Sequence, residues 1–241
     1  MKRINKYIYE HLENPSFSIV ERLHINKDIG NHYNYHPTTG DELKQLVNKL
    51  IKERGNDGDL NDIDTSEIKD MGELFYNSNF NGDISNWDVS NVESMESMFE
   101  ESKFTGENGD ISEWDVSNVK SMISMFSYSS FDGDISQWDV SNVESMDYMF
   151  SLSKFNKDIS NWDVSNVKTM GCMFYRSEFT GENGDISNWD VSNVRDMYCM
   201  FYDSKFNGDI SNWDVSNVEY MKYMFDKSPL EKNPPKWYKK K

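Results

Sequence analysis

The sequence predicts an α/β solenoid built from units of about 24 residues, with a helical cap at its N-terminal end. Three observations predict this fold class. The motif WDVS recurs with its tryptophan at positions 87, 114, 138, 162, 189 and 213, at spacings of 27, 24, 24, 27 and 24 residues. Each unit combines a strand-like and a helix-like apolar pattern. An amphipathic helix precedes the first unit, where it would cover the open end of a stack.

Each unit contains a predicted short parallel strand and then a predicted short helix or 3₁₀ turn. In the first clear unit, Ile84, Trp87 and Val89 lie among strand-forming residues between two turn signals, which predicts a strand of three to five residues. Ser90 and Glu93 have the spacing of a capping box for the helix that follows. The apolar residues of that helix recur at i, i+3, i+6 and i+7: Val92, Met95, Met98 and Phe99.

The array is predicted to span residues 58–241, with degenerate copies at both ends. Ile63 stands 24 residues before Trp87, and Trp237 stands 24 residues after Trp213. One unit offers roughly eight large apolar side chains, worth about 1.5–3 kcal/mol each when buried. Ordering the backbone costs about 1–2 kcal/mol per residue. A unit therefore cannot fold alone, and each is expected to supply half of its neighbour's core.

Two segments precede the array: an N-terminal arm over residues 1–36, with a short helix near its start, and a capping helix within residues 37–57. Thr39 and Glu42 have the spacing of a capping box, and Gly55 stands where a helix-ending glycine belongs. The apolar face of the capping helix consists of Leu43, Leu46, Val47, Leu50 and Ile51. Because the arm is not needed to cover the stack, we expect any docking role of the N-terminal region there.

The charge is strongly acidic and uneven along the chain. The net charge is −17, and residues 57–230 carry 11 Lys and Arg against 34 Asp and Glu. Such a body repels phosphate backbones and anionic membranes, so neither nucleic-acid binding nor membrane insertion is expected. No apolar run reaches the length of a membrane span, and the first residues do not form a secretory signal. We expect a cytoplasmic protein, or one within a particle, that has a protein partner.

The sequence contains no enzyme motif, and its candidate metal ligands are few. We find no glycine-rich phosphate loop, no HExxH and no nucleophile elbow, and we predict no catalytic residue and no cofactor. His32 and His36 have a spacing that suits zinc on a helix, but Pro37 favours a loop.

Two columns of aspartates run along the array. One interpretation is that each carboxylate accepts hydrogen bonds from its own turn amides and the following serine, which we favour. The other is calcium bound between units, because hard cations prefer several carboxylates. The candidate calcium ligands are Asp83, Asp88, Asp110 and Asp115.

Cys172 and Cys199 occupy the same position of adjacent units. Their Cα atoms are expected about 5 Å apart, within the range that a disulfide needs. Parallel stacking often points both Cβ atoms in the same direction, so we expect reduced neighbouring thiols.

The two 27-residue units share the insertion FTGENGDIS, at residues 104–112 and 179–187. Three extra residues within the strand would move Ile111 and Ile186 off the core face. We therefore predict that the insertions bulge outward at the preceding turn and leave the stacking unchanged.

The unit F-N-x-D-I-S-x-W-D-V-S-N-V-x-x-M-x-x-M-F resembles the repeats of the BspA-like leucine-rich-repeat surface proteins, including the mycoplasma lipoprotein-type repeats. The match covers about three quarters of the chain. The resemblance implies a leucine-rich-repeat-like α/β solenoid used for adhesion or protein recognition, with no catalytic residues to carry over. The first residues do not resemble the secretion signal and lipobox cysteine of the surface members, so a cell-surface location is implied by the resemblance alone.

The leading functional hypothesis is a non-enzymatic protein-recognition or structural module, in which a rigid solenoid displays variable residues. Tyrosines are common interface anchors, and they gather towards the C-terminal half. One alternative is a structural component of a phage, viral or other large assembly that docks through the N-terminal arm. Another is an acidic DNA-mimic inhibitor. The candidate partner-binding residues are Tyr148, Tyr175, Tyr198, Tyr202, Tyr220 and Tyr223.

Overall fold

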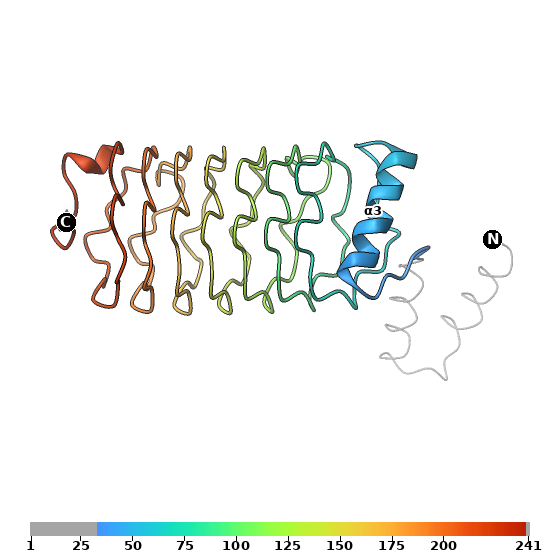
Figure 1. Cartoon of the computed structure of the whole chain (residues 1–241), viewed down its shortest axis with the longest axis horizontal. Helices are drawn as coiled ribbons and strands as arrows, with labels where there is room; N and C mark the ends of the chain where they lie inside the picture. The colour runs from blue at the N-terminus through green and yellow to red at the C-terminus, as the bar shows by residue number, and fades with distance from the viewer. Residues whose placement is uncertain (1–32, 240–241) are drawn as a thin grey trace, which may run out of the picture.

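The computed structural model describes residues 33–239, which form an elongated stack of chain turns that we call coils (Figure 1). α3 (Gly40–Arg54) covers the N-terminal end of the stack, and the short 3₁₀ helix η1 (Pro229–Glu231) follows the last coil. The short helix predicted near the start of the N-terminal arm lies outside the described residues. We number the coils by the residue at the tryptophan position, which is Ile63 in coil 1 and, in coils 2 to 7, Trp87, Trp114, Trp138, Trp162, Trp189 and Trp213.

α3 begins and ends where the sequence predicts a helix. The Thr39 hydroxyl accepts a hydrogen bond from the Glu42 N–H at 3.2 Å, and Gly55, at φ 86°, donates its N–H to the Ile51 carbonyl at 2.9 Å. The predicted capping box differs in one bond, since the Glu42 carboxylate accepts from the N–H of Thr38 at 2.8 Å. The side chains that α3 buries are Leu43, Val47 and Leu50.

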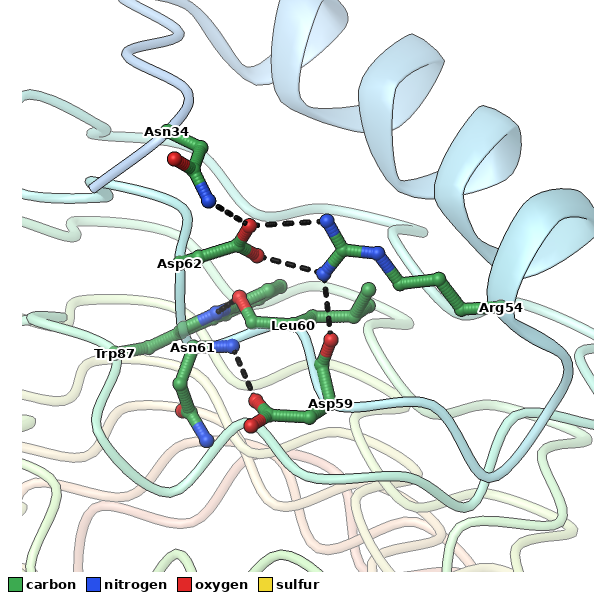
Figure 2. A network of polar contacts seen from close by, with 7 residues as sticks. All are labelled: Asn34, Arg54, Asp59, Leu60, Asn61, Asp62 and Trp87. Carbon is green, nitrogen blue, oxygen red and sulfur yellow. Dashed lines mark hydrogen bonds and ion pairs between the residues drawn. The ribbon is translucent and has the colours of Figure 1, made fainter. Parts of the chain in front are cut away.

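A polar cluster fastens the C-terminal end of α3 to coil 1 (Figure 2). The Arg54 guanidinium donates to both carboxylate oxygens of Asp62, at 2.7 and 2.9 Å, and to the Asp59 carbonyl at 2.7 Å. The Asn34 amide donates to the same Asp62 carboxylate at 2.7 Å. A bidentate arginine–carboxylate pair fixes both position and orientation, so it holds the helix in place over the end of the stack. The Arg54 hydrogen bonds hold the pKa of Asp62 below its usual value.

The coils consist of successive turns and isolated parallel bridges. The strand predicted at residues 84–89 is wrong, because the backbone N–H of Trp87 donates to the Ile84 carbonyl at 3.2 Å and closes a turn. Ser90 does not cap a helix, because its hydroxyl donates to the Asp88 carboxylate at 2.6 Å. Residues 33–239 contain no extended strand and no α-helix besides α3, so assignment to the leucine-rich-repeat-like α/β class stays a prediction.

The helix predicted over residues 92–99 is also wrong, for a reason that lies in the backbone. The N–H of Met98 donates to the Met95 carbonyl at 3.2 Å, closing a turn whose third residue, Ser97, has φ 53°. Alternate amides point to the next coil: those of Met95, Ser97 and Phe99 donate across at 2.8–3.0 Å. A helix would turn these amides inward along its own axis. Bonding between coils therefore requires the turns, which share the i, i+3 spacing of a helix.

The core is a set of repeated side-chain columns that run along the stack. One column of phenylalanines stacks at ring-centroid distances of 5.4–6.0 Å: Phe75, Phe99, Phe126, Phe150, Phe174, Phe201 and Phe225. Outside the core, a column of exposed asparagines, unforeseen from the sequence, donates its side-chain amides to serine carbonyls of the preceding coil at 2.7–2.8 Å: Asn91, Asn118, Asn142, Asn166, Asn193 and Asn217.

The tryptophan column adds a second type of bond between coils, with one exception. Each indole N–H donates to an Ile or Leu carbonyl of the preceding coil at 3.0–3.1 Å, as in the Trp138 bond to Ile111. Trp114 Nε1 is buried and has no hydrogen-bond partner among residues 33–239.

The insertions of the 27-residue units leave the stacking intact, as predicted. Ile111 and Ile186, which follow them, are each only 1% exposed. Glu107 and Asn108 are exposed, and the Asn108 amide donates to the Asn81 carbonyl of the preceding coil at 2.8 Å. The extra residues therefore form a surface loop fastened to its neighbour.

The stack is less well covered at its C-terminal end than at its N-terminal end. Val215, Val218 and Met221 are half-buried, whereas the equivalent residues of coil 6 are buried. Within residues 33–239, no acceptor is recorded for the amides of Met221, Tyr223 and Phe225, although their equivalents in coil 6 donate to coil 7. The tryptophan column continues, through the Trp237 bond to the Ile210 carbonyl at 3.0 Å, and Phe225 contacts the rings of Trp237 and Tyr238.

Candidate functional site

The two residues between the methionines of each coil, or between Met71 and Leu74 in coil 1, form two columns on one face of the stack, and most of their side chains are at least partly exposed. The methionines point inward, and Met146 and Met149 are fully buried. The first outward column reads Gly72, Glu96, Ile123, Asp147, Gly171, Tyr198 and Lys222, and the second reads Glu73, Ser97, Ser124, Tyr148, Cys172, Cys199 and Tyr223. We call this surface the variable face. Its composition changes along the stack while the core positions stay constant.

A groove of about 400 Å³ crosses the variable face over coils 3 to 7, where Ile123 contributes to its lining from coil 3. Three of the candidate tyrosines line it: Tyr148 from coil 4, Tyr198 from coil 6 and Tyr220 from coil 7. They are 46%, 41% and 61% exposed, which is unusual for large aromatic side chains in the described part of the chain. The groove walls are therefore aromatic and accessible.

Gly171 lines the groove at a position where the first outward column lacks a side chain. Its neighbours in the column, Asp147 of coil 4 and Tyr198 of coil 6, stand on either side of the gap. A Cβ atom at Gly171 would lie 3.0 Å from Asp147 Oδ1 and 3.6 Å from Asp196 Oδ1. Two carboxylates thus border the same gap. Gly171 does not need a left-handed backbone, so the missing side chain is its structural contribution.

Hydrogen bonds from neutral groups hold both carboxylates in place. Asp147 accepts from the Gly171 N–H and from the Thr169 hydroxyl, each at 2.6 Å. Asp196 accepts from the N–H of Tyr198 at 2.8 Å. Burial raises the pKa of Asp147, and repulsion from Asp196 adds to this, despite the two hydrogen bonds. The local field therefore disfavours negative charge at Asp147.

The two cysteines are free, buried thiols in the second outward column. Burial raises the pKa of Cys172 to about 11, and the pKa of Cys199 is also raised by burial. The hydrogen bond with Cys172 raises the pKa of Tyr148 to about 12. Since the thiolate is the nucleophile, these cysteines are poorly reactive at neutral pH. This agrees with the expectation of reduced thiols.

The remaining candidate tyrosines lie outside the groove. Tyr175 and Tyr202 stack on each other at 5.2 Å, flanked by Arg176 and Lys227, which lie 5.5 and 5.1 Å from the two rings. Tyr223 meets Tyr198 edge-to-face at 6.0 Å. Of the six tyrosines that the sequence analysis named together, three therefore line the groove and three do not.

The aspartates of the two columns accept hydrogen bonds within their own turns. Asp83 and Asp110 accept from serine N–H groups at 2.9 Å, and Asp88 and Asp115 accept from both the N–H and the hydroxyl of the following serine. The favoured interpretation is thus confirmed for these bonds. Over residues 33–239, no three His, Cys, Asp or Glu side chains are placed to hold a metal ion.

The candidate zinc ligand His36 binds an aspartate. Its Nδ1 lies 3.1 Å from Asp64 Oδ2 at the start of the stack. His32 lies outside the described residues. No helix in the described part of the chain has the length and apolar character needed to cross a membrane.

Sequence reasoning missed Gly171, Asp147 and Asp196 as site residues. The signal was present in the aligned units, because glycine occurs in the first outward column only at Gly72 and Gly171. The alignment did not show that aspartates from the coils on either side of coil 5 border the gap.

A family model described as "Mycoplasma protein of unknown function, DUF285" matches residues 42–152, 102–182 and 153–240. The chain belongs to this family. DUF285 is the family of the Mycoplasma BspA-like repeat proteins, so the resemblance seen in the repeats is confirmed at family level. The DUF285 matches begin inside α3 and run past Trp237, and they include the groove. Neither a curated protein nor a solved structure matches the chain.

Proposed function

We propose that the chain is a non-enzymatic protein-recognition module whose variable face binds a partner protein. The observation that carries this proposal is the groove, which gathers three exposed tyrosines from separate coils. Exposed tyrosines offer large contact area and a polar tip, and they are enriched among the residues that dominate binding energy. The resemblance to BspA-like surface proteins supports the same function, because their repeats are used for adhesion or protein recognition.

The coils supply rigidity to this face. Each coil is joined to the next by alternate backbone amides, an asparagine side chain and stacked phenylalanines. A site held by such a frame loses little conformational freedom on binding, which favours affinity. The outward positions vary without disturbing these contacts, so the frame is suited to presenting different surfaces.

The test is partner capture with the triple variant Tyr148→Ala, Tyr198→Ala and Tyr220→Ala. The full-length chain is immobilised, incubated with a lysate of the organism that carries the gene, and the retained proteins are quantified by mass spectrometry. We expect at least one protein retained by the unchanged chain to be lost by the variant. The matched control is Tyr76→Ala with Tyr128→Ala, which removes tyrosines that are 48% and 56% exposed but lie outside the groove. Equal retention by the unchanged chain and the triple variant would contradict the proposal.

A further inference from the structure

The gap at Gly171 has an excess of negative charge that no described basic side chain balances. The stack commonly pairs acidic and basic residues of adjacent coils, as in Glu93 with Lys120 at 2.6 Å and Asp132 with Lys157 at 3.1 Å. Within residues 33–239, no Lys, Arg or His forms an ion pair with Asp147 or Asp196. Both carboxylates keep lone pairs for further donors.

The tyrosine rings of the groove also lack the neighbouring cation that other tyrosines of the stack have. Lys222 Nζ lies 4.7 Å from the ring centre of Tyr223, and Tyr175 and Tyr202 have Arg176 and Lys227 over their rings. No cation from the described residues is recorded over Tyr148, Tyr198 or Tyr220. Tyrosine faces attract cations within about 6 Å of the ring centre.

We propose that the groove binds the side-chain ammonium of a lysine from a basic segment of the partner protein. The ammonium occupies the gap over Gly171 and donates to Asp147 and Asp196, while the tyrosines enclose its alkyl stem. This rests on the proposed function and names the chemistry of the partner. The acidic body of the chain attracts such a segment over a longer range.

The geometry favours an ammonium over other cations. Its three N–H donors can divide between two carboxylates on different coils. An arginine fork prefers both oxygens of one carboxylate, whereas one oxygen from each of two carboxylates, Asp147 Oδ1 and Asp196 Oδ1, borders the gap. A divalent metal prefers six or more oxygen ligands, whereas the groove offers two carboxylates among aromatic rings.

The test uses Nα-acetyl-lysinamide as the probe and the isotope-labelled full chain as the receptor. The amide signals of Gly171 and Tyr198 are followed by two-dimensional NMR during the titration. We expect saturable shifts at these two amides, with a dissociation constant on the order of millimolar for so small a ligand. Nα-acetyl-norleucinamide, which has a similar stem without the ammonium, is expected to cause no saturable shift.

Charge variants separate a specific site from general attraction. The double variant Asp147→Asn with Asp196→Asn is expected to bind the probe about tenfold more weakly. Asp139→Asn with Asp163→Asn removes the same charge from turns outside the groove and is expected to bind normally. Circular dichroism melts confirm that all variants are folded.

Steric variants test the gap itself. Gly171→Ile fills it with a side chain that the same column already holds at Ile123, and we expect it to abolish the shift at Tyr198. Gly72→Ile is the matched control, because a Cβ there also meets an aspartate oxygen, that of Asp70, at 3.0 Å.

Three results would overturn the proposal: no saturable shift with the lysine probe, equal shifts with norleucine, or equal weakening by both aspartate pairs. The proposed function is judged separately by partner capture. If the tyrosine variant loses a partner while the Asp147 and Asp196 variant keeps it, protein recognition stands and the lysine site is rejected.

Discussion

Trp114 and Trp138 allow the contribution of one buried hydrogen bond to be measured within a single fold. Both indoles are buried, at 4% and 3% exposure, and each contacts a ring of the phenylalanine column, Phe99 for Trp114 and Phe126 for Trp138. Trp138 Nε1 donates to the Ile111 carbonyl at 3.0 Å, whereas Trp114 Nε1 has no partner in the described part of the chain. We therefore propose to replace each tryptophan by phenylalanine and compare the two variants.

The expected difference follows from what each substitution removes. Loss of the second ring costs about 1–2 kcal/mol of unfolding free energy in both variants, since burial is nearly equal. Trp138→Phe also removes the indole hydrogen bond to the Ile111 carbonyl, which costs about 0.5–1.5 kcal/mol more, since that carbonyl still accepts the backbone N–H of Trp114 at 3.2 Å. Trp114→Phe removes an N–H that gains nothing from burial, so this extra cost is absent. Trp138→Phe should therefore melt roughly 1–6 °C below Trp114→Phe.

The measurement is thermal and urea unfolding followed by circular dichroism at a fixed pH. Because long arrays can unfold in stages, the two variants are compared at equal denaturant slope. A control substitution, Trp162→Phe, should behave like Trp138→Phe, since its indole donates to the Ile135 carbonyl at 3.0 Å. Equal destabilisation at positions 114 and 138 would refute the reasoning.

Three further predictions concern the cap, the insertions and the thiols. Arg54→Met should lower the melting temperature and make stability less dependent on pH in acid. The pKa of Asp62 is lower in the folded chain than in the unfolded chain, so its pairing with Arg54 stabilises the fold above about pH 4. This stability is lost as the pH falls through the folded-state pKa. An unchanged pH profile would contradict this. Deleting residues 106–108 and 181–183 together should leave the melting temperature nearly unchanged, and a collapse on calorimetry would show that the loops support the core. With its pKa near 11, Cys172 should react with iodoacetamide at pH 8 far more slowly in the folded chain than in urea, as mass spectrometry would show; equal rates would exclude a buried thiol.

The sequence sufficed to predict the core positions of each repeat, because they follow from burial of apolar side chains. Val92, Met95 and Phe99 are all fully buried, as their spacing predicts. Spacing could not distinguish a helix from successive turns, since both return a side chain to the same face after three residues. Hydrogen bonds between coils decide the matter, and they require Ser97 to adopt a positive φ that serine rarely takes.

The candidate site was predictable only in part. The sequence identified Tyr148, Tyr198 and Tyr220 as candidate partner-binding residues, because tyrosines gather towards the C-terminal half and are common interface anchors. Their grouping around one groove depends on how neighbouring coils are offset, which spacing along one chain does not give. Asp147 and Asp196 lie in different columns, and only stacking brings both beside the same gap.

The unequal ends of the stack give the molecule a direction of unfolding. Bonds between coils reach only the adjacent coil, so opening can proceed one coil at a time. From the N-terminal side, opening must first detach α3 and break the paired contacts of Arg54. From the C-terminal side, residues 220–224 of coil 7 accept backbone hydrogen bonds from coil 6, and the described residues that follow add the Trp237 bond and the ring contacts of Phe225. Fraying therefore begins at coil 7, and hydrogen exchange should be fastest there and slow progressively towards the centre of the stack.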